Sequence, residues 1–276
     1  MPTMPPQGSR LSGSEPHRAR HMAESFGSDA ERYDRARPRY PDALVRRIRA
    51  LAPGPDVLDA GCGTGIAARQ FQDVGCRVLG VEPDARMAEV AGRLGVVVDV
   101  ARFEDWEPGG RRFDVVTAGQ SWHWIDPVAG AVKAAQALRP GGRLVAFWNA
   151  FQLPQEVAQA FSTAYRNVVP DAPFDPKGMV RSAVDPYGTM LTTASEGIGA
   201  AGGFGEPERW RFDWEAVYTR EAFLDQLPTT GLLTRLPPDE LTAILREVGA
   251  AVDTLGGRFT MHYATVAICA ARTGNA

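Results

Sequence analysis

Apolar residues fall into two alternating patterns between residues 42 and 148. Short continuous apolar runs, bounded by glycine, proline or charged residues, predict buried strands over 57–59, 78–82, 96–100, 113–118 and 143–148. Between them apolar residues recur at helical spacing, which predicts helices over 42–52, from residue 66, from about residue 84 and over 128–138. Alternating strands and helices indicate an α/β protein with a parallel, doubly wound sheet.

The alternation stops after residue 149. Helical spacing continues over 155–168, 219–227 and 239–252, and β-branched or aromatic runs predict strands over 210–214 and 259–271. The segment 170–203 is rich in Pro, Gly, Ser and Thr and is weakly periodic, so we expect a long loop that is functional or mobile.

These patterns predict four segments. Residues 1–22 lack apolar periodicity and are expected to be a disordered tail. A ligand-binding core with an N-terminal cap helix is expected over 23–150, and a substrate lid over 151–215. Helices and the closing strand of the same domain are expected over 216–276.

Composition narrows the class of protein. The net charge of -3 gives no basic surface for nucleic acid, and no continuous apolar stretch approaches the roughly 18 residues of a membrane span. Three widely spaced cysteines without a CxxC pair predict neither a disulfide framework nor a zinc site. We therefore expect a cytoplasmic protein, a monomer or homodimer, with no catalytic metal and no nucleic-acid or membrane partner.

A glycine-rich loop follows the first predicted strand. The strand ends in Asp59, glycines stand at 61, 63 and 65, and a helix begins at Ile66. A strand, glycine loop and helix in this order present backbone N–H groups to a nucleotide-like ligand. The dinucleotide pattern G-x-G-x-x-G would need glycine at position 66, where this chain has isoleucine.

The pattern D-x-G-x-G-x-G over Asp59, Gly61, Gly63 and Gly65 instead resembles motif I of the class I S-adenosylmethionine-dependent methyltransferases. The expected fold is a Rossmann-like, doubly wound sheet of seven strands, mostly parallel with an antiparallel last strand, and a helical and loop lid after strand five. The resemblance implies S-adenosylmethionine as cofactor, S-adenosylhomocysteine as product, and Asp59 near the cofactor's ammonium group.

Two further elements are expected to bind the adenosine part of the cofactor. Glu82 ends the second strand, 17 residues after Gly65, where an acid accepts both ribose hydroxyls; the alternative is a solvent-exposed acid at a strand end. Pro83 is expected beside it. After strand three, Arg102 stands where the family often has an adenine acceptor, so a backbone contact near Phe103 or Glu104 is expected instead.

The run from Gly119 to Asp126 is expected to border the methyl-transfer site. It contains Gln120, an expected cofactor contact, and the aromatic triplet Trp122, His123 and Trp124. It is similar to small-molecule methyltransferases of the trans-aconitate and ubiquinone-biosynthesis type, and the likeness covers roughly residues 24–150. His123 is either a base or an orienting group. The two tryptophans either face the acceptor or the sulfonium as substrate contacts, or form plain apolar packing.

Tyr33 and Arg37 precede the core, where the resemblance places a helix over the cofactor. Tyr33 is expected to cap the methionine end and Arg37 to pair its carboxylate; the alternative is an exposed polar linker with Arg37 in water. The leading functional hypothesis is methyl transfer to a small molecule, with O-methylation favoured. The alternatives are a non-catalytic S-adenosylmethionine-binding or regulatory protein and, less favoured, a nicotinamide-dependent oxidoreductase.

Overall fold

The computed structural model describes residues 20–170 and 185–274. Most of the predicted tail over 1–22 lies outside these ranges; Arg20 begins the 3₁₀ helix η2 (Arg20–Asp29). The described residues divide into two compact units. The first, here called the helical unit, draws on 1–37, 150–185 and 213–264, and the second, the sheet unit, on 38–149, 186–212 and 265–276.

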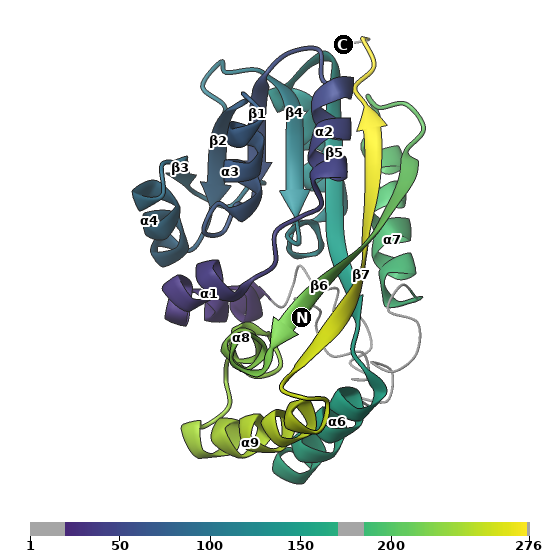
Figure 1. The fold of residues 1–276 in the computed structure, drawn as a ribbon. Coiled ribbons are helices and arrows are strands. Elements are labelled where there is room, and N and C mark those ends of the chain that lie inside the picture. The colour runs from purple at the N-terminus through teal and green to yellow at the C-terminus, as the bar shows by residue number, and fades with distance from the viewer. Residues whose placement is uncertain (1–19, 171–184, 275–276) are drawn as a thin grey trace. The chain divides into compact units, whose positions relative to one another are not determined.

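Within the described ranges, seven strands form one sheet in the order β3-β2-β1-β4-β5-β7-β6 (Figure 1). The strands are β1 (Asp56–Ala60), β2 (Arg77–Glu82), β3 (Val97–Val100), β4 (Phe113–Gly119), β5 (Leu138–Gln152), β6 (Glu208–Thr219) and β7 (Arg258–Ala271). The first five pair in parallel, and β7 is antiparallel. The predicted α/β sheet with an antiparallel last strand is therefore confirmed.

Besides α7, which is described below, the helices of the sheet unit are α2 (Asp42–Leu51), α3 (Ile66–Asp73), α4 (Ala85–Arg93), η3 (Trp122–Trp124) and α5 (Pro127–Ala137). Acidic side chains cap the beginnings of α4 and α5. The carboxylate of Asp84 accepts a backbone N–H at the start of α4, and that of Asp126 does so at the start of α5. The apolar faces of α2 and α3 join the sheet in a core that includes Leu44, Ile48 and Phe71.

The prediction of a loop over 170–203 is wrong for the second half of this segment. Helix α7 (Asp185–Ala201) is present there, while residues 171–184 lie outside the described ranges. Its buried side chains recur at helical spacing, at Tyr187, Leu191, Ala194 and Ile198. Gly197 reads as a loop residue, but an added Cβ would lie 2.5 Å from Cβ of Pro127, so this glycine permits close packing of the helix.

Strand β5 is also longer than predicted. Residues 139–142, which lie between the predicted helix and the predicted strand, are part of β5: Leu138 pairs with Phe113 before the register shifts, and Arg143 pairs with Val115. Pro140, Gly141 and Gly142 lie at this irregularity, where Gly141 has φ of 76°.

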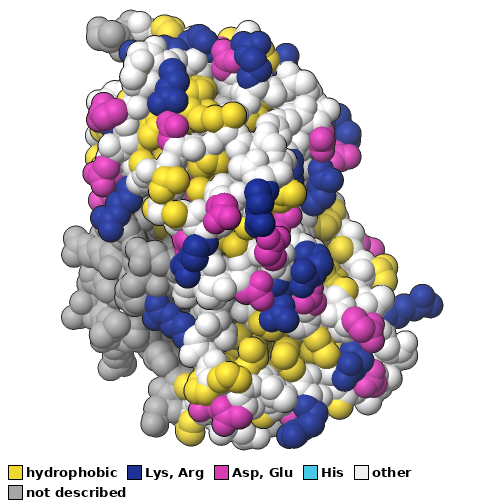
Figure 2. Space-filling view, turned by 90° about the vertical axis from the view of Figure 1, so that its left-hand side faces the viewer, with side chains coloured by type: hydrophobic (Ala, Val, Ile, Leu, Met, Phe, Trp, Pro, Cys, Tyr) yellow, Lys and Arg dark blue, Asp and Glu magenta, His cyan; other side chains and the backbone are white. Residues whose placement is uncertain are grey.

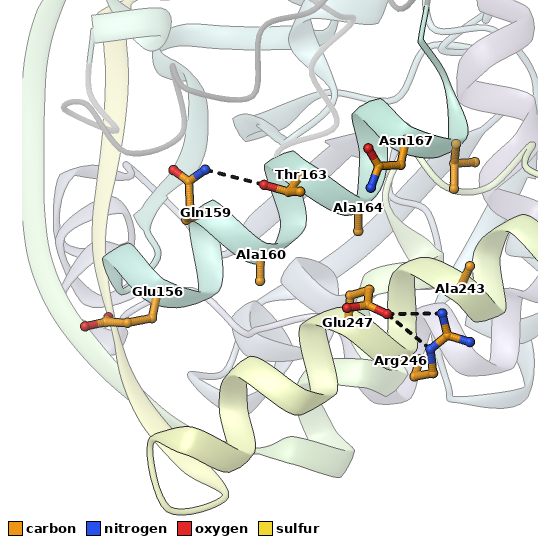
Figure 3. A pocket seen from close by; sticks show the side chains of 10 residues that line it. Glu156, Gln159, Ala160, Thr163, Ala164, Asn167, Ala243, Arg246 and Glu247 are labelled. Carbon is orange, nitrogen blue, oxygen red and sulfur yellow. Dashed lines mark hydrogen bonds and ion pairs between the residues drawn. The ribbon is translucent and has the colours of Figure 1, made fainter.

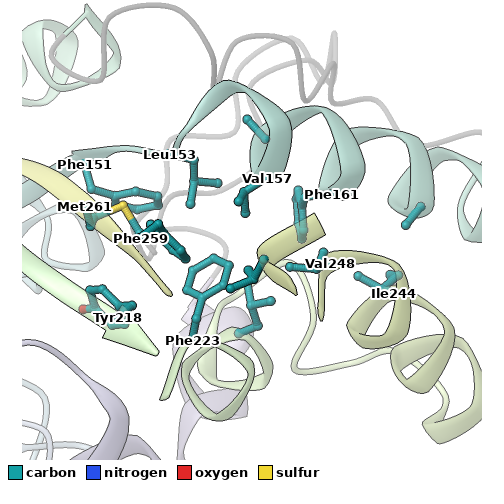
Figure 4. Close-up of a cluster of buried hydrophobic side chains, with 14 of the residues drawn as sticks. Phe151, Leu153, Val157, Phe161, Tyr218, Phe223, Ile244, Val248, Phe259 and Met261 are labelled. Carbon is teal, nitrogen blue, oxygen red and sulfur yellow. The ribbon is translucent and has the colours of Figure 1, made fainter. Parts of the chain in front are cut away.

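The helical unit has a core of its own. Its elements, besides η2, are α1 (Ala30–Ala36), α6 (Gln155–Val168), α8 (Arg220–Gln226), η5 (Leu227–Thr229) and α9 (Pro238–Thr254). Val157 and Phe161 of α6 pack with Ile244 and Val248 of α9 in one apolar cluster (Figure 4). Each such side chain contributes about 1.5–3 kcal/mol on burial.

A hollow of about 490 Å³ runs between α6 and α9 of this unit (Figure 3). Its lining mixes polar and small side chains, with Gln159 bonded to Thr163 and Arg246 paired with Glu247. None of the predicted site residues lines it.

Charges of both signs are interspersed on the face drawn in Figure 2. Among the described residues, no helix combines the length and apolar character needed to cross a membrane.

Candidate active site

The glycine loop joins β1 to α3 and uses a backbone that favours glycine. Gly61, Gly63 and Gly65 have φ of 67°, 56° and 84°. A Cβ on Gly61 would lie 2.6 Å from Cβ of Ser121, and one on Gly65 would lie 2.9 Å from Cγ2 of Val96. At Gly63 an added Cβ would lie 3.6 Å from Cε of Met87, an ordinary van der Waals contact, so it is the positive φ rather than crowding that favours glycine there.

Glu82 connects this loop to the end of β2. Its Oε2 accepts the backbone N–H of Gly63 at 2.8 Å, and its Oε1 accepts that of Asp84 at 3.0 Å. The side chain is buried, so the alternative of a solvent-exposed acid does not hold. Burial raises the pKa of the Glu82 carboxyl to about 7, and the two N–H donors partly oppose this. A carboxylate has about four acceptor positions, so Glu82 retains capacity for ligand hydroxyls.

Asp59 is a second buried carboxylate, at the end of β1. Its Oδ1 accepts the hydroxyl of Thr117 at 2.9 Å, while Oδ2 is buried and has no hydrogen-bond partner among the described residues. Burial raises the pKa of Asp59 to about 6. A buried acceptor without a donor costs about 1–3 kcal/mol, so this oxygen is a natural place for a ligand donor.

Gln120 has an unusual backbone at the end of β4. Its φ is 56°, and within the described ranges it is the sole non-glycine residue with positive φ. The strain is held by two bonds to β5: the N–H of Gln120 donates to the carbonyl of Phe147 at 2.8 Å, and its Oε1 accepts the N–H of Asn149 at 3.2 Å.

The residues expected at the adenine differ in exposure. Phe103 is buried, with its ring 6.4 Å from that of Trp122. The carboxylate of Glu104 accepts the N–H of Asp126 at 3.0 Å, which ties the segment after β3 to the start of α5. Pro83 is exposed beside Glu82.

The aromatic triplet occupies η3. Trp122 is buried, whereas Trp124 is half-buried with its ring 4.7 Å from that of His123. Nδ1 of His123 accepts the indole N–H of Trp148 at 3.2 Å. Sequence reasoning missed Trp148, because it lies 25 residues away on a strand where an aromatic residue reads as core.

Tyr33 and Arg37 belong to the helical unit. Arg37 is buried rather than in water: its guanidinium lies 4.8 Å from the centre of the Tyr33 ring and donates to the carbonyl of Thr229. Their expected contact with the cofactor stays a prediction.

No group of three or more His, Cys, Asp or Glu side chains in the described part of the chain is arranged to hold a metal ion.

Comparison with known proteins gives matches to methyltransferases. A family model described as a methyltransferase domain matches residues 33–168. An uncharacterized methyltransferase of Mycobacterium tuberculosis (strain ATCC 25618 / H37Rv) is 36% identical over 132 residues, 47% of this chain and 54% of the relative. A ubiquinone biosynthesis O-methyltransferase of Methylocella silvestris is 36% identical over 100 residues, 34% of this chain and 39% of the relative.

Among solved structures, a protein of Anaeromyxobacter dehalogenans assigned as a type II methyltransferase matches with a TM-score of 0.61 and 27% identity. The match covers 84% of this chain and 97% of that one. The chain thus spans about half the length of the curated relatives it matches, and most of the length of this solved structure.

Proposed function

Residues 33–168 are a class I S-adenosylmethionine-dependent methyltransferase domain, and from this premise we propose that the protein methylates a small-molecule acceptor. The bound cofactor supplies a methyl group on a cationic sulfonium: the acceptor's lone pair bonds to the methyl carbon as the carbon–sulfur bond breaks and leaves its electrons on sulfur. The observation that carries the proposal is the buried Glu82 carboxylate bonded to Gly63 of the glycine loop.

The residues present fit this cofactor. Oδ2 of Asp59 lacks a donor, and the cofactor's ammonium group would provide one. Glu82 retains acceptor positions for the two ribose hydroxyls after bonding two backbone N–H groups. Gly63 carries no Cβ, so a ligand can approach the backbone of the loop at this position. Asp59, Gly61, Gly63, Gly65 and Glu82 would therefore hold the cofactor.

The acceptor in this proposal is a small molecule methylated on oxygen. O-methylation is supported by the named activity of the ubiquinone biosynthesis relative. The net charge of -3, together with the mixed charges on the one face drawn in Figure 2, favours a small molecule over a nucleic-acid acceptor.

Calorimetric titration tests the cofactor assignment. S-adenosylmethionine, S-adenosylhomocysteine and NAD are titrated into the wild type, Glu82→Gln and Glu89→Gln. Glu89 is an exposed glutamate on α4 and makes the matched control. Losing carboxylate acceptor capacity at Glu82 should weaken S-adenosylmethionine binding ten- to about a hundredfold, since a hydrogen bond to a charged group contributes about 1.5–3 kcal/mol. Glu89→Gln should bind as the wild type does.

Tighter binding of NAD, or equal binding by both variants, would refute the assignment. Turnover is then measured as release of S-adenosylhomocysteine in the presence of hydroxylated and carboxylated small molecules. Cofactor binding without turnover on any acceptor class would instead favour a non-catalytic binding protein.

A further inference from the structure

A tryptophan on β5 fixes one ring nitrogen of His123. The indole N–H of Trp148 donates to Nδ1 of His123 at 3.2 Å. Trp148 is 1% exposed, so its N–H cannot turn to water, whereas His123 is half-buried on η3. Both residues belong to the sheet unit.

The direction of this bond determines where the proton of a neutral His123 lies. An indole N–H can only donate, and a neutral imidazole has one nitrogen that donates and one that accepts. Because Nδ1 accepts from Trp148, the ring proton is on Nε2. A proton on Nδ1 would set two donors against each other and leave the buried indole N–H of Trp148 without an acceptor.

We propose that Trp148 is a positioning residue that holds neutral His123 in the Nε2–H tautomer, so that Nε2 is a hydrogen-bond donor and His123 is not the base of the reaction. This inference rests on the proposed function and decides between the two roles that the sequence leaves open for His123. To take a proton at Nε2, a neutral His123 would already have to carry its ring proton on Nδ1. The indole N–H of Trp148 opposes that state.

The tautomer has a consequence for the acceptor. An acceptor whose nucleophilic oxygen is already ionised, as a carboxylate is at neutral pH, needs no base and fits this tautomer. In the transfer step that oxygen gains the methyl group and loses its negative charge, and no proton passes to His123.

Nuclear magnetic resonance of ¹⁵N-histidine-labelled protein tests the tautomer without any ligand. The chain has four histidines, and the His123 signals are identified by their loss in His123→Gln. The wild type should show an unprotonated Nδ1 and a protonated Nε2 at His123. Trp148→Phe removes the indole donor and should produce a mixture of tautomers.

Trp106→Phe is the matched control. Trp106 is also buried, and its indole N–H donates at 2.8 Å to Asp99 rather than to His123. This variant should leave the His123 signals unchanged. A wild-type His123 with its proton on Nδ1 would overturn the proposal, whether or not Trp148→Phe folds.

Substitutions at His123 separate a donor from a base in turnover. The side-chain amide nitrogen of glutamine can donate from about the position of Nε2, whereas asparagine is too short to reach it. A donor role predicts that His123→Gln stays within about tenfold of the wild type while His123→Asn loses more. A base role predicts that both lose about 10²–10⁴-fold, because neither amide accepts a proton. If the wild type turns over no acceptor, the proposed function fails, while the tautomer measurement still judges the role of Trp148.

Discussion

The buried carboxyl of Glu82 should make the stability of the folded chain depend on pH in a way that one substitution removes. Its pKa of about 7, against an ordinary value of 4.5, reflects burial first of all. Below pH 4.5 the carboxyl is protonated in both the folded and the unfolded chain. As the pH rises to about 7, the unfolded chain ionises first, so the free energy of unfolding falls.

The expected size follows from the two pKa values. The wild type should lose about 3 kcal/mol between pH 4.5 and pH 7.5 through this group alone. Glu82→Gln cannot ionise, so it lacks this dependence. Exchanging the protonated carboxyl for an amide, which meets the N–H groups of Gly63 and Asp84 differently, adds an offset that is the same at every pH.

Urea unfolding of the wild type and Glu82→Gln, at half-unit steps between pH 4.5 and pH 8, measures the difference between their free energies of unfolding. Other carboxylates titrate in both proteins and cancel in that difference, while Glu89→Gln, which alters an exposed acid, should follow the wild type. A difference that is flat across this range would refute the claim that the folded chain holds Glu82 in a desolvated environment.

Three further substitutions have defined outcomes. Gly61→Ala should lower the free energy of unfolding by about 1–2 kcal/mol because of its positive φ, and further because of the contact with Ser121. Gly75→Ala, with φ of 82° and open space around it, should lose only the part due to φ. Equal losses for the two variants in urea unfolding would argue against the contact with Ser121. Thr117→Val should raise the pKa of Asp59 further and lower stability at pH 7.5 by about 1–3 kcal/mol, since Oδ1 loses its hydroxyl donor; unchanged unfolding would show that another group replaces it. Phe161→Ala should lose about 3–5 kcal/mol from the helical unit's core, with Phe161→Leu losing less, and thermal unfolding would contradict this if both variants melt as the wild type does.

The sequence predicted those strands and helices whose buried residues follow one uninterrupted apolar pattern. Helix α6 was expected over 155–168 and is found at Gln155–Val168, because its apolar residues repeat every three or four positions between clear boundaries. Helix α7 was missed because glycine and threonine dilute its apolar face, and Gly197 is explained by a neighbour, Pro127, that lies far away in the sequence.

The parts of the candidate site formed by residues close together in the sequence were predictable, whereas contacts between residues far apart in the sequence were not. The glycine loop and Glu82 are set by strand ends, which the sequence marks with acids. The burial of Asp59, the strained Gln120 and the bond from Trp148 to His123 depend on strands β4 and β5, which are brought together only by folding. A hydrogen-bond donor and its acceptor on separate elements produce no recognisable spacing pattern in the sequence.

The short segment that carries His123 is anchored at both ends. Gln120 is bonded to β5 through backbone and side chain, and Asp126 is held by Glu104 while its carboxylate caps α5. Lengthening this segment would break at least one of these anchors, whereas side-chain exchanges inside it would leave both intact. Under the proposed function, a change of acceptor preference should therefore be sought by substitution at positions such as Trp124 rather than by loop grafting.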